Sequence, residues 1–202
     1  MRATIKQWVK YLMRRRQRQS PLPPYYNRVY ILEAARQVIA QESEAKYGIE
    51  TGGVLVGFVD SGLHVVVVTA ASGPGPHATH GPTTFNRDRA FCQIFLDTHA
   101  RETGGIIDFV GEWHKHREPA PQPSQVDIKT YRRLAADSRC HLDLPLVLIV
   151  GTEAKHGPIP VDAYVCVNAF VFRRDGFVRR PVHQLPDDAY QRLLVDSTDE
   201  LA

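Results

Sequence analysis

The chain has 202 residues, of which 43% are hydrophobic, and its formal net charge is +3. This length and composition predict one domain with a proper core and short extensions. No run of eighteen apolar residues occurs and the charged N-terminus lacks an apolar signal stretch, so we expect neither a membrane-spanning helix nor secretion. The cysteines are few, widely spaced and without a CxxC pair, which favours free buried thiols in a cytoplasmic protein. They are Cys92, Cys140 and Cys166.

The first 18 residues are strongly basic, with seven Lys and Arg residues and no acid. Ile5, Trp8, Val9 and Leu12 lie at helical spacing, so this segment is predicted to form a basic amphipathic helix. Such a helix could contact an acidic partner, nucleic acid or an anionic membrane, but a solvated helix is the favoured interpretation. A Pro-rich linker follows, and we treat residues 1–24 as one N-terminal unit.

The segment from residue 25 to residue 113 predicts a helix, a hairpin, a loop, a second helix and a strand. The ranges are, in that order, 29–47, 54–59 with 63–70, 71–82, 87–102 and 106–113. Strong helix formers and Gly48 as a stop indicate the first helix, and β-branched runs around Asp60-Ser61-Gly62 indicate the hairpin. His77 and His80 lie in the loop with two residues between them. Their spacing could hold a second metal, although a mobile polar loop over an active site is favoured.

The rest of the chain predicts a helix, further strands and an acidic tail. The ranges are a helix over 128–139, strands over 144–150 and 161–172, a turn at 174–176 into 177–178, and a short final helix from Asp187. This order is typical of a mixed α/β fold with a single sheet flanked by helices. We expect a main domain over residues 25–182 and a tail over 183–202.

Two histidines, a serine and an aspartate lie within fourteen residues after the predicted strand 106–113: His114, His116, Ser124 and Asp127. Residues two apart in a strand share a face, so both imidazoles can reach one metal ion. A Pro-rich stretch then leads to Ser124, a plausible helix N-cap with Asp127 at the third helical position. Two His and one Asp leave an open zinc position for water, as hydrolytic chemistry requires.

Each part of this pattern has a simpler interpretation when it stands alone. A Ser-x-x-Asp before an apolar helix is usually only a helix cap. A lone His-x-His is usually a structural or surface feature. The combination, placed after a strand and before a helix, favours a metal site.

The four-residue spacing resembles the JAMM motif of JAB/MPN-domain metalloproteases, and the resemblance covers roughly residues 29–171. Residues Glu50–Gly57 resemble the family segment in which a glutamate precedes a Gly-rich buried strand. The sequence Gly111–His114 resembles the bacterial Prok-JAB branch. Two departures are visible: Lys115 stands where the family often has Ser or Thr, and Arg117-Glu118 stand where Pro commonly follows. Neither removes a ligand, but both could alter substrate contacts.

The resemblance implies the MPN/JAB (cytidine deaminase-like) fold and a role for each motif residue. His114, His116 and Asp127 would bind one Zn²⁺ per chain. Glu50 would act as the general base for the attacking water, and Ser124 would position water or stabilise the oxyanion.

Glu112 competes with Glu50 for the role of base. It lies two residues before His114 and would share its face in a regular strand, where it could instead be a hydrogen-bonded partner of a ligand histidine. The resemblance favours Glu50, whereas spacing alone does not decide between the two.

The implied activity is that of a zinc isopeptidase or peptidase that cleaves after the C-terminus of a ubiquitin-like protein. Similar bacterial proteins accompany E1- and E2-like conjugation enzymes in antiphage defence operons, so deconjugation and precursor processing both fit. A non-catalytic MPN scaffold and a zinc hydrolase of another amide are the alternatives. A DNA-associated branch also exists, but only the basic N-terminus hints at it, and we expect no nucleic-acid partner.

Overall fold

The computed structural model describes residues 28–60, 64–116, 122–136, 145–151, 167–173, 176–180 and 182–187. The expected N-terminal helix and linker, the Pro-rich stretch 117–121 and the tail beyond Asp187 lie outside the described residues. The expected division into 1–24, 25–182 and 183–202 therefore stays a prediction.

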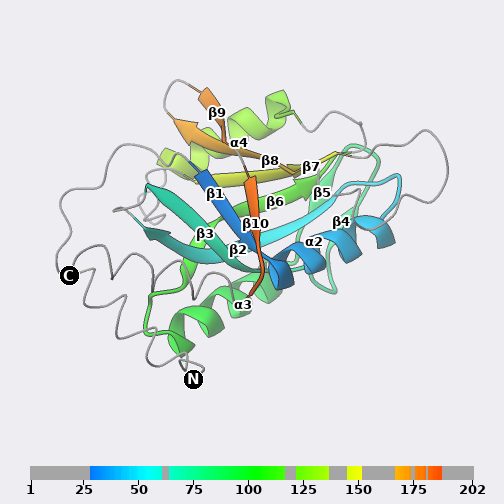
Figure 1. Ribbon diagram of the computed structural model, residues 1–202. Coiled ribbons are helices and arrows are strands. Elements are labelled where there is room, and N and C mark those ends of the chain that lie inside the picture. The colour runs from blue at the N-terminus through cyan, green and yellow to red at the C-terminus, as the bar shows by residue number, and fades with distance from the viewer. Residues whose placement is uncertain are drawn as a thin grey trace, which may run out of the picture.

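A mixed sheet of eight strands forms the centre of the molecule, in the order β10-β1-β3-β2-β6-β7-β8-β9 (Figure 1). The strands are β1 (Arg28–Leu32), β2 (Thr51–Asp60), β3 (Val65–Ala71), β6 (Asp108–Lys115), β7 (Leu146–Val150), β8 (Val167–Arg173), β9 (Gly176–Arg180) and β10 (Val182–Leu185). A separate two-stranded ribbon joins β4 (Thr79–His80) to β5 (Phe85–Asn86).

Within the described ranges, three helices pack against this sheet: α2 (Glu33–Ala45), α3 (Arg89–Glu102) and α4 (Gln125–Ala136). Helix α2 contacts β2 and β3, α3 contacts β2 and β6, and α4 contacts β8. The predicted mixed α/β fold with one main sheet flanked by helices is confirmed. None of the described helices is long and apolar enough to cross a membrane.

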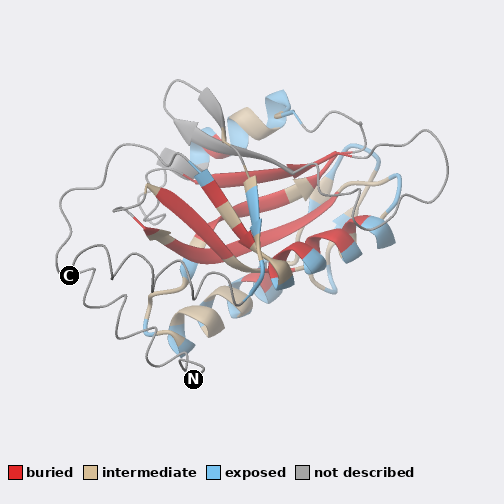
Figure 2. Cartoon of the chain, in the orientation of Figure 1, coloured by how far each residue is buried: buried red, intermediate tan, exposed pale blue. Residues whose placement is uncertain are grey.

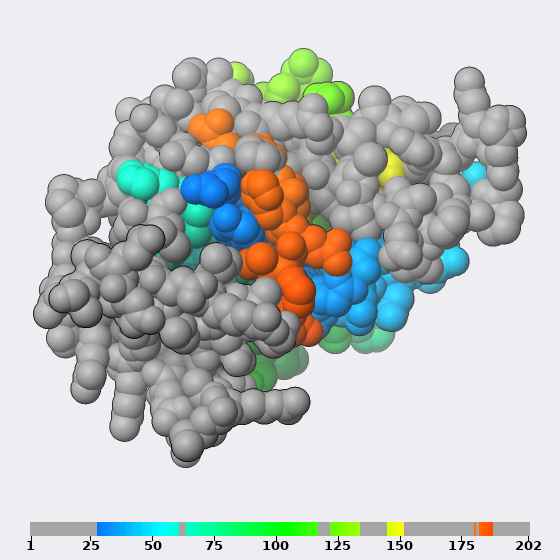
Figure 3. All heavy atoms as spheres, viewed as in Figure 1, coloured from blue at the N-terminus to red at the C-terminus, as the bar shows by residue number. Residues whose placement is uncertain are grey.

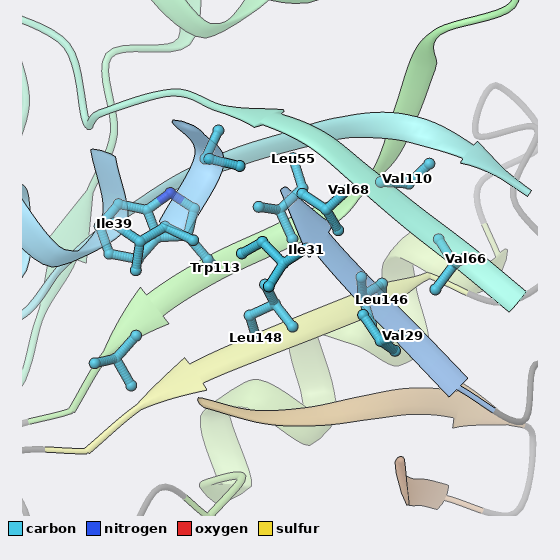
Figure 4. Close-up of a cluster of buried hydrophobic side chains, with 13 residues drawn as sticks. Val29, Ile31, Ile39, Leu55, Val66, Val68, Val110, Trp113, Leu146 and Leu148 are labelled. Carbon is cyan, nitrogen blue, oxygen red and sulfur yellow. The ribbon is translucent and has the colours of Figure 1, made fainter. Parts of the chain in front are cut away.

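The hydrophobic core lies where the middle strands meet helix α2, and these strands are coloured as buried in Figure 2. Branched aliphatic side chains from β1, β2, β3 and β7 gather around Ile39 of α2 and Trp113 of β6 (Figure 4). Trp113 is 1% exposed, and its indole nitrogen donates a hydrogen bond of 2.8 Å to the Ser72 carbonyl. Strand β6 is thus anchored in the core immediately before His114.

The predicted helix over 29–47 is wrong in its first residues, which form strand β1. This strand pairs in parallel with β3 on one side and with β10 on the other. Its sequence, RVYIL, is rich in β-branched and aromatic residues, which suit a strand buried between two neighbours. The helix begins only at Glu33 and ends at Ala45, before Gly48, whose φ is +78°.

Most other predicted elements are confirmed with shifted ends. The antiparallel pairs β2–β3 and β8–β9 fit the two predicted turns, whose tips at 61–63 and 174–175 lie outside the described residues. Strand β2 begins at Thr51 rather than residue 54, since its first residues pair with β6. The predicted loop 71–82 contributes Thr79–His80 to the ribbon. Cys92 is a buried free thiol, as expected, and Cys140 and Cys166 lie outside the described residues.

Candidate metal centre

The end of strand β6 places His114 and His116 on one face of the sheet. Strand β6 is paired on both sides, with His114 opposite Gly52 of β2 and opposite Ile149 of β7. The amide of His116 continues the ladder by donating to the Val150 carbonyl over 3.0 Å. Because side chains alternate along a strand, the two imidazoles project together, and their ring centroids are 4.7 Å apart.

The first turn of α4 brings Asp127 to these histidines. The Ser124 amide donates to Asp127 Oδ2 over 2.6 Å, and the Asp127 amide donates to Ser124 Oγ over 3.2 Å. This reciprocal pair satisfies donors that the first helical turn leaves without partners, so the predicted cap is confirmed. The cap holds the carboxylate of Asp127 in place, so that Oδ1 lies beside His114 and Oδ2, which also accepts the Ser124 amide, lies beside His116.

Three ligand atoms converge in a small volume. His114 Nε2 lies 3.2 Å from Asp127 Oδ1, His116 Nε2 lies 3.2 Å from Asp127 Oδ2, and the two Nε2 atoms are 2.8 Å apart. Zinc–ligand bonds of 2.0–2.1 Å at tetrahedral angles separate ligand atoms by roughly 3.3 Å. The donor set of two imidazole nitrogens and one carboxylate therefore fits a zinc ion with only a slight opening of the histidine pair. Among the described residues this is the one cluster that could hold a metal.

The electrostatics of Asp127 favour its ionised form. Burial by itself raises the pKa of this carboxyl group. Hydrogen bonds from His114 and His116, the charge of His114 and the hydrogen bond with Ser124 together hold the pKa well below its usual range. The site thus offers an ionised carboxylate to a cation.

Glu50 lies immediately before β2, next to the metal cluster in the order of the sheet. Thr51 is opposite Lys115 and Gly52 is opposite His114, so a continuation of this register by one pair would set Glu50 opposite His116. Opposite residues of an antiparallel pair share a face, so an extension of this register would put Glu50 on the side of the histidines. Its amide donates to the Gly81 carbonyl over 3.1 Å, and its carbonyl lies 2.9 Å from His80 Nδ1.

Glu112 is instead bound into a buried network. Its carboxylate forms an ion pair with Arg87 and accepts a hydrogen bond of 3.3 Å from the Tyr131 hydroxyl. Tyr131 is 2% exposed and lies four residues after Asp127, so it shares that face of α4. The partners that the structure gives Glu112 are thus Arg87 and Tyr131 rather than a ligand histidine. The network nevertheless fastens the helix that carries Asp127 to the strand that carries His114.

Gly52 is a further site residue, one that the sequence analysis did not single out. A Cβ atom there would lie 3.0 Å from His114 Cβ and would collide with the Trp113 carbonyl oxygen. The absence of a side chain at Gly52 therefore allows β2 to lie close to the backbone of Trp113 and to the Cβ of His114. The register of β2 on β6 was the missing information, because only the pairing shows which residue faces His114.

The structure also gives the positions of two other residues to which the sequence drew attention. Lys115 is 0% exposed and donates to backbone carbonyls in the interior, so it has no access to a substrate. His80 contacts Glu50 rather than joining His77 in a second metal site, and the one candidate metal cluster of the described residues contains neither of them.

Comparison with known proteins gives consistent similarities. A family described as prokaryotic homologs of the JAB domain matches residues 32–166. The chain is 24% identical to a probable metalloprotease of Sinorhizobium fredii over 60% of this chain and 74% of that protein. It is 32% identical to a CD-NTase/cGAS isopeptidase of Enterobacter hormaechei over 52% of this chain and 56% of that protein. The solution structure of a Desulfitobacterium hafniense protein shares the fold, with a TM-score of 0.55 and 19% identity over 78% of this chain and 93% of that one.

Proposed function

This chain belongs to the family of prokaryotic homologs of the JAB domain, and from that premise we propose that it is a zinc-dependent isopeptidase that cleaves after the C-terminus of a ubiquitin-like modifier. At the level of the family, the relatives named metalloprotease and isopeptidase support a hydrolase of peptide or isopeptide bonds. The metal, the residue roles and the modifier are the parts that we propose.

The observation that carries the proposal is the convergence of His114, His116 and Asp127 on one point. Three protein ligands leave one tetrahedral position open, which distinguishes hydrolytic zinc sites from structural ones. When bound, zinc supplies a Lewis acid and a nucleophilic water at neutral pH.

The chain's own residues would then move protons and orient the reacting groups. Glu50, on the histidine side of the sheet, would take a proton from the attacking water and return it to the leaving amine. Ser124 Oγ accepts a hydrogen bond from the Asp127 amide, and a hydroxyl group that accepts one hydrogen bond still has its own proton to donate. We propose that this proton stabilises the negative charge that develops on the scissile carbonyl oxygen.

The ribbon β4–β5 is the proposed wall of the substrate channel. It contacts β2, and its Gly81 carbonyl accepts the amide proton of Glu50, so it borders the proposed base directly. The extended C-terminal tail of a modifier could pair with an edge of this ribbon by main-chain hydrogen bonds. This pairing would hold the last carbonyl group of the tail in register with the metal. Strand β4 of the ribbon lies within the Gly- and Pro-rich region 71–82, which is expected from its composition to lie over the active site.

A biological role in antiphage defence, beside E1- and E2-like conjugation enzymes encoded nearby, is part of the same proposal. Removal of a modifier from its target and trimming of its precursor both hydrolyse an amide bond after the last residue of the modifier. The proposed site is compatible with either reaction. The non-catalytic scaffold is the weaker alternative, because the three ligand side chains are present and already converge.

The test combines metal analysis with cleavage of a ubiquitin-like protein fused to a reporter. We expect one zinc per chain in the wild type, cleavage that stops when a chelator is added, and loss of both zinc and cleavage in His116→Ala. His77→Ala is the matched control, since it removes an imidazole outside the cluster and should retain both. Full zinc and full activity in His116→Ala, or cleavage that survives chelation, would overturn the proposal.

A further inference from the structure

We propose that Lys115 and His80 are positioning residues that hold the backbone around Glu50 in register with the metal ligands. The inference rests on the proposed function, in which Glu50 is the general base. It assigns a role to the residue between the two ligand histidines and to a histidine of the ribbon, neither of which touches the reacting atoms.

Lys115 reaches from the ligand strand to the connection that carries Glu50. Its neighbours in sequence are the two ligand histidines, so its own side chain projects from the other face of β6. There its Nζ donates to the Lys46 carbonyl over 2.6 Å and to the Ile49 carbonyl over 3.4 Å, with the Tyr47 ring 5.9 Å away. One side chain thus binds both ends of the short turn that precedes Glu50.

The burial of Lys115 makes these two contacts important. The residue is 0% exposed, and a buried ammonium group needs strong acceptors to offset its lost hydration. Lys46 follows the last turn of α2, where carbonyl groups lack helical partners and carry the negative end of the helix dipole. The ammonium group therefore donates to a carbonyl group at the C-terminal end of α2. Its second hydrogen bond, to the Ile49 carbonyl, holds the residues before Glu50 next to strand β6.

His80, in the ribbon outside the main sheet, contacts the backbone of Glu50 itself. Its Nδ1 lies 2.9 Å from the Glu50 carbonyl oxygen, while the Gly81 carbonyl accepts the Glu50 amide proton. The ring of His80 packs 5.4 Å from the Phe85 ring on the facing strand of the ribbon, which fixes its direction. Both backbone groups of Glu50 are consequently engaged by the ribbon, and the residue before it is engaged by Lys115.

The contacts of Lys115 connect the proposed base to the metal ligands through strand β6. The end of β6 presents His114 and His116 on one face. On the other face, Lys115 donates hydrogen bonds to the turn before Glu50. A shift of that turn would move the carboxylate of Glu50 without moving the histidines. Misplacement of a reacting group by about 1 Å is enough to cost up to ~100-fold in rate.

Lys115→Met keeps the unbranched apolar stem and most of the length of the side chain, and it removes the three N–H donors. We expect normal zinc content and KM, a kcat lowered by about 10- to 100-fold, and faster amide hydrogen exchange at Ile49 and Glu50. Lys46→Met is the matched control: it removes a nearby ammonium group but leaves the Lys46 carbonyl in place, and it should behave as the wild type. His80→Ala should show the same pattern as Lys115→Met, more weakly, and it carries the test alone if Lys115→Met does not fold.

The same substitutions, tested in a variant that lacks the proposed base, separate a positioning role from general destabilisation. In Glu50→Gln, measured by single turnover, the added Lys115→Met or His80→Ala change should cost less than roughly twofold, because the group that it positions is already gone. An equal loss in both backgrounds, or zinc lost in proportion to activity, would overturn the inference. If the wild type cleaves no ubiquitin-like fusion, the proposed function fails on its own. The exchange measurement still decides, since unchanged protection at Glu50 in both variants refutes the positioning role.

Discussion

Removal of the Glu112 carboxylate should affect both the stability of the protein and its hold on the metal. In Glu112→Ala, Arg87 loses its ion-pair partner and the Tyr131 hydroxyl loses its carboxylate acceptor. Burial raises the pKa of Tyr131 well above its ordinary value, so the phenol remains a donor throughout the working range of pH. The variant therefore takes a charged acceptor away from a buried donor.

The magnitude follows from the exposure of each partner. A buried hydrogen bond to a charged acceptor contributes about 1.5–3 kcal/mol, and Tyr131 is 2% exposed. A fully buried ion pair would cost about 3–5 kcal/mol to break, but the Arg87 side chain is 35% exposed and water screens much of that loss. We expect Glu112→Ala to lower the free energy of unfolding by about 3 kcal/mol, and Tyr131→Phe, which keeps the ion pair, by about 1.5 kcal/mol.

The same variants separate the two candidate bases. Urea unfolding gives the stability change, and competition with a chelator gives the zinc affinity. Because Glu112 fastens α4 to β6, Glu112→Ala should weaken zinc binding by about 10- to 100-fold. Glu50→Ala should instead retain zinc and lose about 100- to 10,000-fold in kcat. The opposite pattern, with zinc lost in Glu50→Ala and kcat lost in Glu112→Ala at full metal content, would refute this reasoning and exchange the two assignments.

Three further outcomes are expected. Gly52→Ala should distort His114 and lower zinc affinity in the chelator assay, whereas Gly73→Ala, where a Cβ meets nothing within 4 Å, should match the wild type. Ser124→Ala should lower the free energy of unfolding by about 1 kcal/mol through loss of the helix cap and should lower kcat as well, while Ser124→Thr should retain most of both, as urea titration and kinetics would show. In metal-free protein, the depressed pKa of Asp127 contributes stability that is present above its unfolded pKa of about 3.9 and is lost as the pH falls through its folded value. The stability gap between wild type and Asp127→Asn should therefore narrow in acid below about pH 4, and a constant gap would contradict the assignment.

Much of the His–Asp cluster was predictable because its two parts are each local, although their convergence depends on how α4 packs. Alternation along a strand sets His114 beside His116, and the cap of α4 is encoded by Ser124 and Asp127 alone. The Arg87–Glu112 ion pair was not predictable, since it depends on how α3 approaches β6 across a separation of 25 residues. The strand β1 was missed for a similar reason: residues 28–32 run directly into strong helix formers, and only their partners in β3 and β10 decide their conformation.

The pairing of β1 with β10 has a consequence for biosynthesis. These strands lie side by side on the molecular surface in Figure 3, although more than 150 residues of sequence separate Val29 from Val182. During translation, one edge of β1 stays unpaired until β10 has been synthesised. An unpaired strand edge can form hydrogen bonds with other chains and so promotes aggregation. Expression variants truncated before Val182 should accordingly accumulate in inclusion bodies, whereas variants that end just after Asp187, whose carboxylate accepts the Ala34 amide at the start of α2, retain the strand that closes this edge.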